Sequence, residues 1–441
     1  NKLFYFLDVE ASRIALPTVQ DVTAPSPAFE QMTLNALASG GTATDPDSGS
    51  KITANPASIP FYNRIFALYP KGGTATPLYG CPIGSAASLA AFAAGTAAGG
   101  DGCANFQSYG VTNSTDQTYV LYRMDADLNS DNSIWFKYDQ NLGTQATYTD
   151  PLNSVFNADS YQPERDGEAE WQHIFGPNVI NVLNTGFTWY SAIFQQTNPS
   201  AALATFPYTM TNALGNGPWF TDLGGDQFIW PQGRNVTQWQ VIDNLSWMHG
   251  NHDFTFGEDL KRVDVSDHDF GFFNTPYAGV DNVTEFEYGA VGYSSQAFPA
   301  TQVEPIALTD LDMYAGDVWQ MTPSFTFDYG IRASWNEDPV NQHGLFSYPD
   351  TSFSQMSHNP DQPMDQAVVD GKSLMLPSTP LLVWQPRIGF AWQLAPKTVL
   401  RGGFGFFSDI FPASLADSMG ENLPYYNSFN EGTLFGLPYQ L

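Results

Sequence analysis

The amino-acid sequence predicts an all-β fold, an antiparallel transmembrane β-barrel with long loops at one rim. Three observations predict it. Aromatic residues make up 15% of the 441 residues and charged residues only 14%, beside 38 glycines and 31 prolines, which is typical of strands and turns with exposed aromatic surface. Apolar and polar side chains alternate with a period of two. Short turns alternate with long connections along the chain.

The alternation is clearest in the stretch SFTFDYGIRASW. One face of this predicted strand carries Phe325, Phe327, Tyr329, Ile331, Ala333 and Trp335, and the residues between them are polar or small. The stretches PRIGFAW and TVLRGGFGFF repeat the pattern. A period of two indicates strands whose two faces meet different surroundings.

Five short connections rich in Asn, Asp, Gly and Pro predict hairpin turns at residues 129–133, 176–178, 249–252, 322–324 and 395–397. Long connections separate the hairpins at residues 141–166, 196–235, 264–309 and 336–383. Outer-membrane barrels have short periplasmic turns and long outer loops. An opening strand, KLFYFLDVE, and five hairpins give eleven strands, about half of a 22-stranded barrel.

The region from about residue 11 to 116 is expected to be one long external loop. It holds both cysteines, Cys81 and Cys103, and an Ala-rich stretch at residues 83–100 that is expected to form a short helix. The two cysteines are a candidate disulfide, which would place the chain in an oxidising compartment; free thiols remain the alternative.

The chain is strongly acidic, with a formal net charge of −29. Such a charge repels phosphate backbones, so nucleic acid is not an expected partner. The acids mainly indicate a solvated surface, with bridging divalent ions as the alternative.

His249 and His252 flank Gly250 and Asn251, where one predicted strand reverses into the next. Their spacing therefore follows from a hairpin turn, and half of a metal site is the less favoured alternative. The stretch DPDSGSK at residues 45–51 has a faint likeness to a calcium loop but is more simply a polar turn.

Strand alternation also predicts which residues face lipid and which face the barrel lumen. A membrane girdle is expected from Trp135, Trp189, Trp247, Trp319, Trp335 and Trp392. The alternative is that these residues fill a sandwich core. Candidate lumen residues are Asp328, Arg332, Arg387 and Arg401, which could contact a solute or form ion pairs with one another.

No enzyme is expected. Two carboxylate pairs, Asp125 with Asp127 and Asp310 with Asp312, have a spacing that could imitate a glycosidase pair, but such acids are also expected of a polar barrel interior. No phosphate loop or nucleophile triad is evident, and no cofactor or metal is expected.

Several stretches of the chain resemble one family. DMYAGDVWQMTPSFTFDYGIRASW, PRIGFAWQLAPKTVLRGGFGFFSD, DNLSWMHGNHDFTFGEDLKR, FGPNVINVLNTGFTWY and YRMDADLNSDNSIWFKYDQN resemble the barrel of TonB-dependent outer-membrane receptors, in particular the Oar-like (OmpA-related) group. The opening NKLFYFLDVEASR and IPFYNRIFALYP resemble the first barrel strands and an adjoining loop.

The resemblance implies a large barrel in the bacterial outer membrane, a plug domain, and active import of a solute too large for porins, driven by the TonB system. No plug domain or TonB box is recognised in this chain. Its expected partners are outer-membrane lipid, the TonB system and an unidentified solute.

Two other functions remain open. The barrel could anchor a structural or adhesive surface protein whose loops do the work, or the chain could be a secreted glycan-binding β protein. The direction of the apolar strand faces distinguishes these hypotheses. The apolar faces point outward to lipid in a transporter and in a barrel-anchored surface protein. They point inward to a dry core in a secreted glycan-binding protein.

Overall fold

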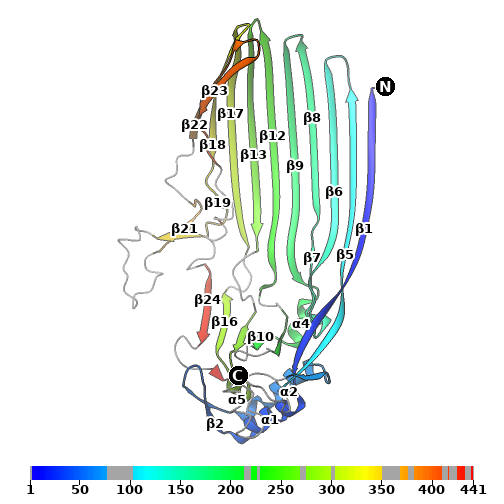
Figure 1. Ribbon diagram of the computed structural model, residues 1–441, viewed down its shortest axis with the longest axis vertical. Coiled ribbons are helices and arrows are strands. Elements are labelled where there is room, and N and C mark those ends of the chain that lie inside the picture. The colour runs from blue at the N-terminus through cyan, green and yellow to red at the C-terminus, as the bar shows by residue number, and fades with distance from the viewer. Residues whose placement is uncertain are drawn as a thin grey trace.

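A computed structural model describes residues 2–76, 103–212, 220–225, 229–268, 275–298, 303–349, 368–375, 382–409, 416, 425–432 and 439–440. Most of this chain is one tall antiparallel sheet, with a smaller folded unit at the end opposite the hairpin turns (Figure 1).

Eleven long strands form the sheet. They are β1 (Leu3–Pro25), β5 (Ala104–Asp127), β6 (Asn132–Tyr148), β8 (Glu164–Gly176), β9 (Val179–Gln196), β12 (Gln232–His249), β13 (His252–Asp267), β17 (Glu304–Thr322), β18 (Phe325–Asn336), β22 (Leu382–Ala395) and β23 (Thr398–Gly405). Consecutive strands in this series are hydrogen-bonded to each other, with β1 and β23 at the two edges. The expected antiparallel order is therefore confirmed.

All five predicted turns join neighbouring strands. At the turn between β12 and β13, His249 pairs with His252, and Gly250 has a φ of 61°. That left-handed conformation suits glycine because glycine has no Cβ, and it closes a two-residue hairpin. The two histidines are thus placed by the turn.

The predicted loop from residue 11 to 116 is too wide. β1 pairs with β5 from Leu3 opposite Ala126 as far as Pro25 opposite Ala104. Pro17 makes the middle of β1 look like a loop, but β1 has no other partner among the described residues, and an edge strand tolerates a residue without an N–H. The connection is therefore shorter, and the Ala-rich stretch and Cys81 lie in residues 77–102, outside the described part.

The sheet has two chemically different faces. Residues directly opposite in register share a face, so the register relates Arg332 to Tyr314, Gly257 and Asn244 across four strands. We call this the polar face. The opposite, aromatic face carries exposed Trp384 and Phe404, which are 59% and 65% exposed.

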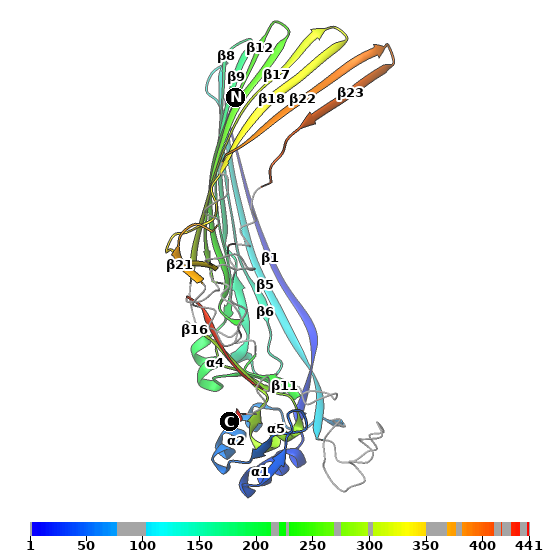
Figure 2. The same ribbon diagram turned by 90° about the vertical axis from the view of Figure 1, so that its left-hand side faces the viewer.

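No described second sheet packs on the aromatic face, and the buried cores lie near the outer end of the strands. Within the described residues, the aromatic face is therefore not packed into the dry core that a secreted glycan-binding protein would need. Figure 2 shows that the sheet is bent and twisted rather than flat. Within the described residues its edges, β1 and β23, do not pair with each other.

The smaller unit, here called the cap, is built from the outer loops (Figures 1 and 2). Its helical segments are α1 (Pro27–Ser39), η1 (Pro56–Ser58), α2 (Ile59–Leu68), η2 (Ser154–Phe156), α4 (Pro199–Thr205) and α5 (Val283–Tyr288). Ser26 caps α1, since its side chain accepts a hydrogen bond from the Phe29 amide, and Gly40 ends that helix.

Short strands complete the outer part of the chain. They are β2 (Thr42–Thr44), β3 (Lys51–Thr53), β4 (Thr74–Thr76), β7 (Ala158–Tyr161), β10 (Thr209–Asn212), β11 (Phe220–Leu223), β14 (Tyr277–Val280), β15 (Ala290–Val291), β16 (Tyr293–Phe298), β19 (Val340–Asn341), β20 (Phe346–Pro349), β21 (Val368–Lys372), β24 (Asn427–Gly432) and β25 (Tyr439–Gln440). Among the described helices, none has both the length and the apolarity needed to cross a membrane.

One hydrophobic core joins segments of the cap that are far apart in sequence. The ring of Phe286 on α5 lies at its centre, 5.5 Å from Phe29, 5.4 Å from Tyr62 and 5.5 Å from Phe220 between centroids. Such tilted and edge-on arrangements are the favourable ones for aromatic rings. The same core includes Val22 and Ala24 of β1 and Ala104 of β5, so it holds the outer loops together and ties them to the outer ends of two barrel strands.

Replacing Phe286 by Ala should loosen the cap and leave the sheet intact. The loss of a buried ring costs about 3–5 kcal/mol. Hydrogen–deuterium exchange should therefore speed up in α1, α2 and α5 but not in β12 or β13. Leu203→Ala, which changes an exposed side chain on α4, is the control. Equal protection of the cap in both variants would contradict this core.

Candidate functional site

A column of carboxylates runs along β8 on the polar face. Glu164, Asp166, Glu168 and Glu170 alternate with residues of the aromatic face, so all four point the same way. No described cation forms an ion pair with them. The column therefore gives this part of the polar face a negative field.

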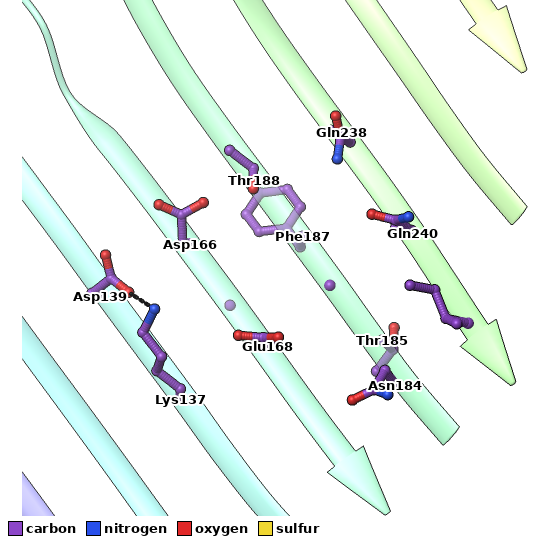
Figure 3. A pocket seen from close by; sticks show the side chains of 13 residues that line it. Lys137, Asp139, Asp166, Glu168, Asn184, Thr185, Phe187, Thr188, Gln238 and Gln240 are labelled. Carbon is purple, nitrogen blue, oxygen red and sulfur yellow. Dashed lines mark ion pairs between the residues drawn. The ribbon is translucent and has the colours of Figure 1, made fainter. Parts of the chain in front are cut away.

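The middle of this column borders a hollow of about 230 Å³ over β6, β8, β9 and β12 (Figure 3). Gly186 lies opposite Glu168 and Gln240 in register and leaves space where a side chain would project. The lining is polar, with Asp166, Glu168 and Gln240 on neighbouring strands. Lys137 pairs with Asp139 at 3.0 Å on its rim.

Other charges on the polar face neutralise one another. Lys261 pairs with Asp310 at 3.0 Å, and Arg123 pairs with Asp125 at 2.7 Å. Gln240 donates a hydrogen bond to Asp259 at 2.9 Å. Such pairs reduce the cost of holding charges inside a barrel. The column on β8 differs from them because it forms no close ion pair, although Arg123 on β5 and Lys137 on β6 interact electrostatically with Glu168.

The four predicted lumen residues share the polar face, as register shows. Arg332 contacts Asp312 rather than any of the other three. Arg387 lies over the ring of Phe407, 4.6 Å from its centroid, while Asp328 and Arg401 are exposed. The four are thus brought to one face, but mutual ion pairing among them does not occur.

The two aspartate pairs are part of the same polar lining. Asp310 and Asp312 contact different cations, Lys261 and Arg332. Asp125 contacts Arg123. These contacts fit a polar interior and leave no pair of carboxylates poised over a common substrate position.

Five of the six predicted girdle tryptophans lie on the aromatic face. These are Trp189, Trp247, Trp319, Trp335 and Trp392. The prediction is wrong for Trp135, which shares the polar face with Lys137. There the guanidinium of Arg123 lies over its ring, 4.5 Å from the centroid. This cation–π contact explains how a polar face holds an indole.

The turn histidine has a role that its spacing does not reveal. Nδ1 of His252 is 2.7 Å from Asp317 Oδ2, which also accepts a hydrogen bond from the Tyr329 hydroxyl at 2.7 Å. Asp317 is 65 residues away in sequence, so no local motif predicts the contact. Within the described part of the chain, no group of three or more candidate metal ligands occurs.

The predicted turn at residues 45–51 is confirmed by its hydrogen bonds. The Asp45 carboxylate accepts from the amides of Asp47 and Ser48 and from the Ser48 hydroxyl. Asn282 donates from the cap to both Asp45 and Asp47, at 2.8 Å each. Although burial opposes ionisation of Asp45, these bonds together hold its pKa below the ordinary value.

Two buried glutamates on α5 have the opposite behaviour. Burial raises the pKa of Glu287 to about 7. Burial also raises the pKa of Glu285 to about 7, although the Asp281 amide donates a hydrogen bond to it, and the nearby carboxylates of Asp281, Asp45 and Asp47 raise it further. These charges lie in the cap and not in the spanning strands.

The candidate disulfide stays a prediction. Cys103 is buried in the cap core, just before β5, but Cys81 lies outside the described residues.

A family model described as an outer membrane beta barrel domain matches residues 1–434. The chain belongs to this family. It is therefore an antiparallel β-barrel domain of the bacterial outer membrane, in contact with outer-membrane lipid. No curated protein sequence matches it.

Solved structures similar to this barrel domain include the outer membrane transporter YddB from Escherichia coli (TM-score 0.39, 10% identity, 67% of this chain and 40% of that one). Others are the copper transporter OprC (0.36, 10%, 66% and 37%) and the open form of the ferric-catecholate import receptor Fiu from E. coli K12 (0.37, 10%, 66% and 47%). The barrel domain spans less than half of the length of each.

Replacing Glu287 by Gln should stabilise the cap at high pH only. The folded cap keeps the Glu287 proton up to about pH 7, whereas the unfolded chain loses it near its ordinary pKa of 4.5. Folded-state stability therefore falls as pH rises from about 4.5 to 7 and stays low above. The variant should gain up to about 3 kcal/mol at pH 8 and nothing at pH 4.

Hydrogen–deuterium exchange of α5, compared between variant and parent at the same pH, checks this. Glu30→Gln, which removes a carboxylate paired with Lys71 at the cap surface, should not give the same gain. If Glu287→Gln changed the stability of the cap equally at pH 4 and pH 8, the folded cap would not keep a proton on the Glu287 carboxyl group.

Proposed function

We propose that this barrel domain belongs to a TonB-dependent receptor of the Oar-like group, which takes up a solute too large for porins. The observation that carries the proposal is the polar face, with its unpaired column of carboxylates beside a hollow, on a sheet whose other face is aromatic. A sheet with these two faces surrounds a wet interior in the membrane.

The cap supplies a surface at the outer end of this interior. Its aromatic core keeps the outer loops folded together, so a captured solute would meet a shaped surface rather than loose loops. The polar face then offers alternating hydrogen-bond donors and acceptors along the path, such as Gln238, Thr188 and Asp166. A plug and coupling to TonB belong to the proposal for the whole receptor.

The carboxylate column favours solutes that carry positive charge or many hydroxyl groups. In a narrow interior with low-dielectric walls the field of like charges is focused, which concentrates cations and repels anions. Hydroxyl groups are also good donors to carboxylates.

The cap favours a second function, adhesion or surface structure anchored by the barrel. Its hydrophobic core, which keeps the outer loops folded, would support binding to a surface without any transport. The two functions differ in whether a solute disappears from the medium and whether TonB is needed.

The test compares the native bacterium with strains that lack this receptor or lack TonB. Mass spectrometry of spent medium should show that both deletion strains leave behind the same solutes, and that these solutes are too large to pass through a porin. If depletion is the same in all three strains, while attachment to surfaces is lost without the receptor, adhesion replaces transport.

Within the receptor, neutralising Asp166, Glu168 and Glu170 together, as Asn, Gln and Gln, should lower uptake of the depleted solute about tenfold, from the loss of about 1.4 kcal/mol of favourable interaction. The control is Asp253→Asn compared with Glu168→Gln alone, because each removes one negative charge from the polar face and Asp253 lies near the turns, away from the hollow. Equal loss in both variants would argue against a specific path over β8.

A further inference from the structure

Three histidines lie on the aromatic face at the turn end of the sheet. They are His173 on β8, His249 on β12 and His252 on β13. Aromatic rings surround them: Trp171 and Phe175 beside His173, Trp247 beside His249, and Phe254 and Trp319 beside His252. We call these residues the histidine band. Short turns mark the periplasmic rim, so the band meets lipid headgroups there.

The proton of His252 is fixed by its partner. Its Nδ1 faces Asp317 Oδ2 at 2.7 Å, and a carboxylate only accepts, so Nδ1 carries a hydrogen. The ring is stacked between Phe254 and Trp319, with centroids 5.3 and 5.1 Å away. In the neutral imidazole the other nitrogen, Nε2, is then an acceptor, and no described residue forms a hydrogen bond with it.

His173 has the same arrangement with different residues. Its Nδ1 is 2.7 Å from Asn132 Oδ1, which also receives the Trp171 indole N–H at 3.1 Å. An indole only donates, so this atom of Asn132 is the oxygen, and Nδ1 of His173 must donate as well. Nε2 again has no described partner and is left as an acceptor. Two imidazoles in one band thus present the same unused group.

The charge of the band fits a cation. The side chain of Asp317 is only 3% exposed. Its Oδ1 has no hydrogen-bond partner among the described residues. No lysine or arginine occupies the described positions of this band or the turns from β5 to β18. The faces of Trp171 and Trp319 add the negative side of an aromatic quadrupole.

We propose that the histidine band binds the primary ammonium headgroup of an aminophospholipid in the periplasmic leaflet. His252 and His173 lie on strands separated by β9 and β12, so each takes its own headgroup. At His252 the ammonium donates a hydrogen bond to Nε2, lies against Trp319 and is attracted by the Asp317 carboxylate. At His173 a second ammonium donates to Nε2 and lies against Trp171. A quaternary ammonium has the same charge but no N–H, so it cannot satisfy Nε2. A phosphate would need donors, which neutral Nε2 does not provide.

The test is native mass spectrometry of the full-length receptor in detergent, with equal amounts of dioleoyl phosphatidylethanolamine, phosphatidylcholine and phosphatidylglycerol. The ethanolamine lipid should remain bound about fivefold more than the choline lipid, as expected for one or two net hydrogen bonds. The double variant His173→Phe, His252→Phe should reduce this ratio to about one while keeping the aromatic surface.

His249→Phe is the matched control, because its ring lies in the same band without an oxygen partner among the contacts described, and its ratio should not change. Asp317→Asn, which removes the charge behind His252, should lower the ratio in part. Heat-modified mobility in gels verifies that each barrel is folded. Equal binding of the ethanolamine and choline lipids by the parent would overturn the proposal, as would a preference for the glycerol lipid that the double variant loses.

Discussion

The constraint on which this structure depends is the pairing of every long strand with its neighbours while the two faces of the sheet meet different media. In a membrane, backbone N–H and C=O groups have no water to bind, so register must be continuous. Side-chain direction then passes unchanged from strand to strand. Glu168 on β8 and Arg332 on β18 share a face for this reason, although they are far apart in sequence.

The same register explains why charge is treated differently in different places. On the polar face, Lys261 pairs with Asp310 one strand away, and Arg123 pairs with Asp125 two residues away on the same strand. At the turn rim, Asp317 is tolerated on the aromatic face because His252 and Tyr329 donate to it. In the cap, Glu287 lacks such donors, and burial keeps its proton instead. Ion pairing, hydrogen bonding and protonation each reduce the free-energy cost of removing a carboxylate from water.

The sequence predicted what depends on local pattern. Period-two alternation and turn chemistry located the five hairpins and the faces of Arg332, Arg387 and Arg401. It failed where distant partners decide. Pro17 suggests a loop as long as β1 is not known to be an edge strand. Trp135 suggests a membrane girdle as long as the position of Arg123 over its ring is not known. The contacts of Asp317 join residues from three strands. The core around Phe286 likewise unites loops that no local pattern connects.

The most direct test of the two-faced sheet is a spin-label scan along β12 in the full-length receptor in lipid, on a background without cysteines. Oxygen, which concentrates in lipid, should speed up the relaxation of spin labels at positions 241 and 245 on the aromatic face. A water-soluble nickel chelate should instead speed up the relaxation of spin labels at positions 240 and 244 on the polar face. Strict alternation between the two reagents is the predicted result. Access of the chelate to all four positions would contradict a lipid-facing aromatic side and the barrel path built on it.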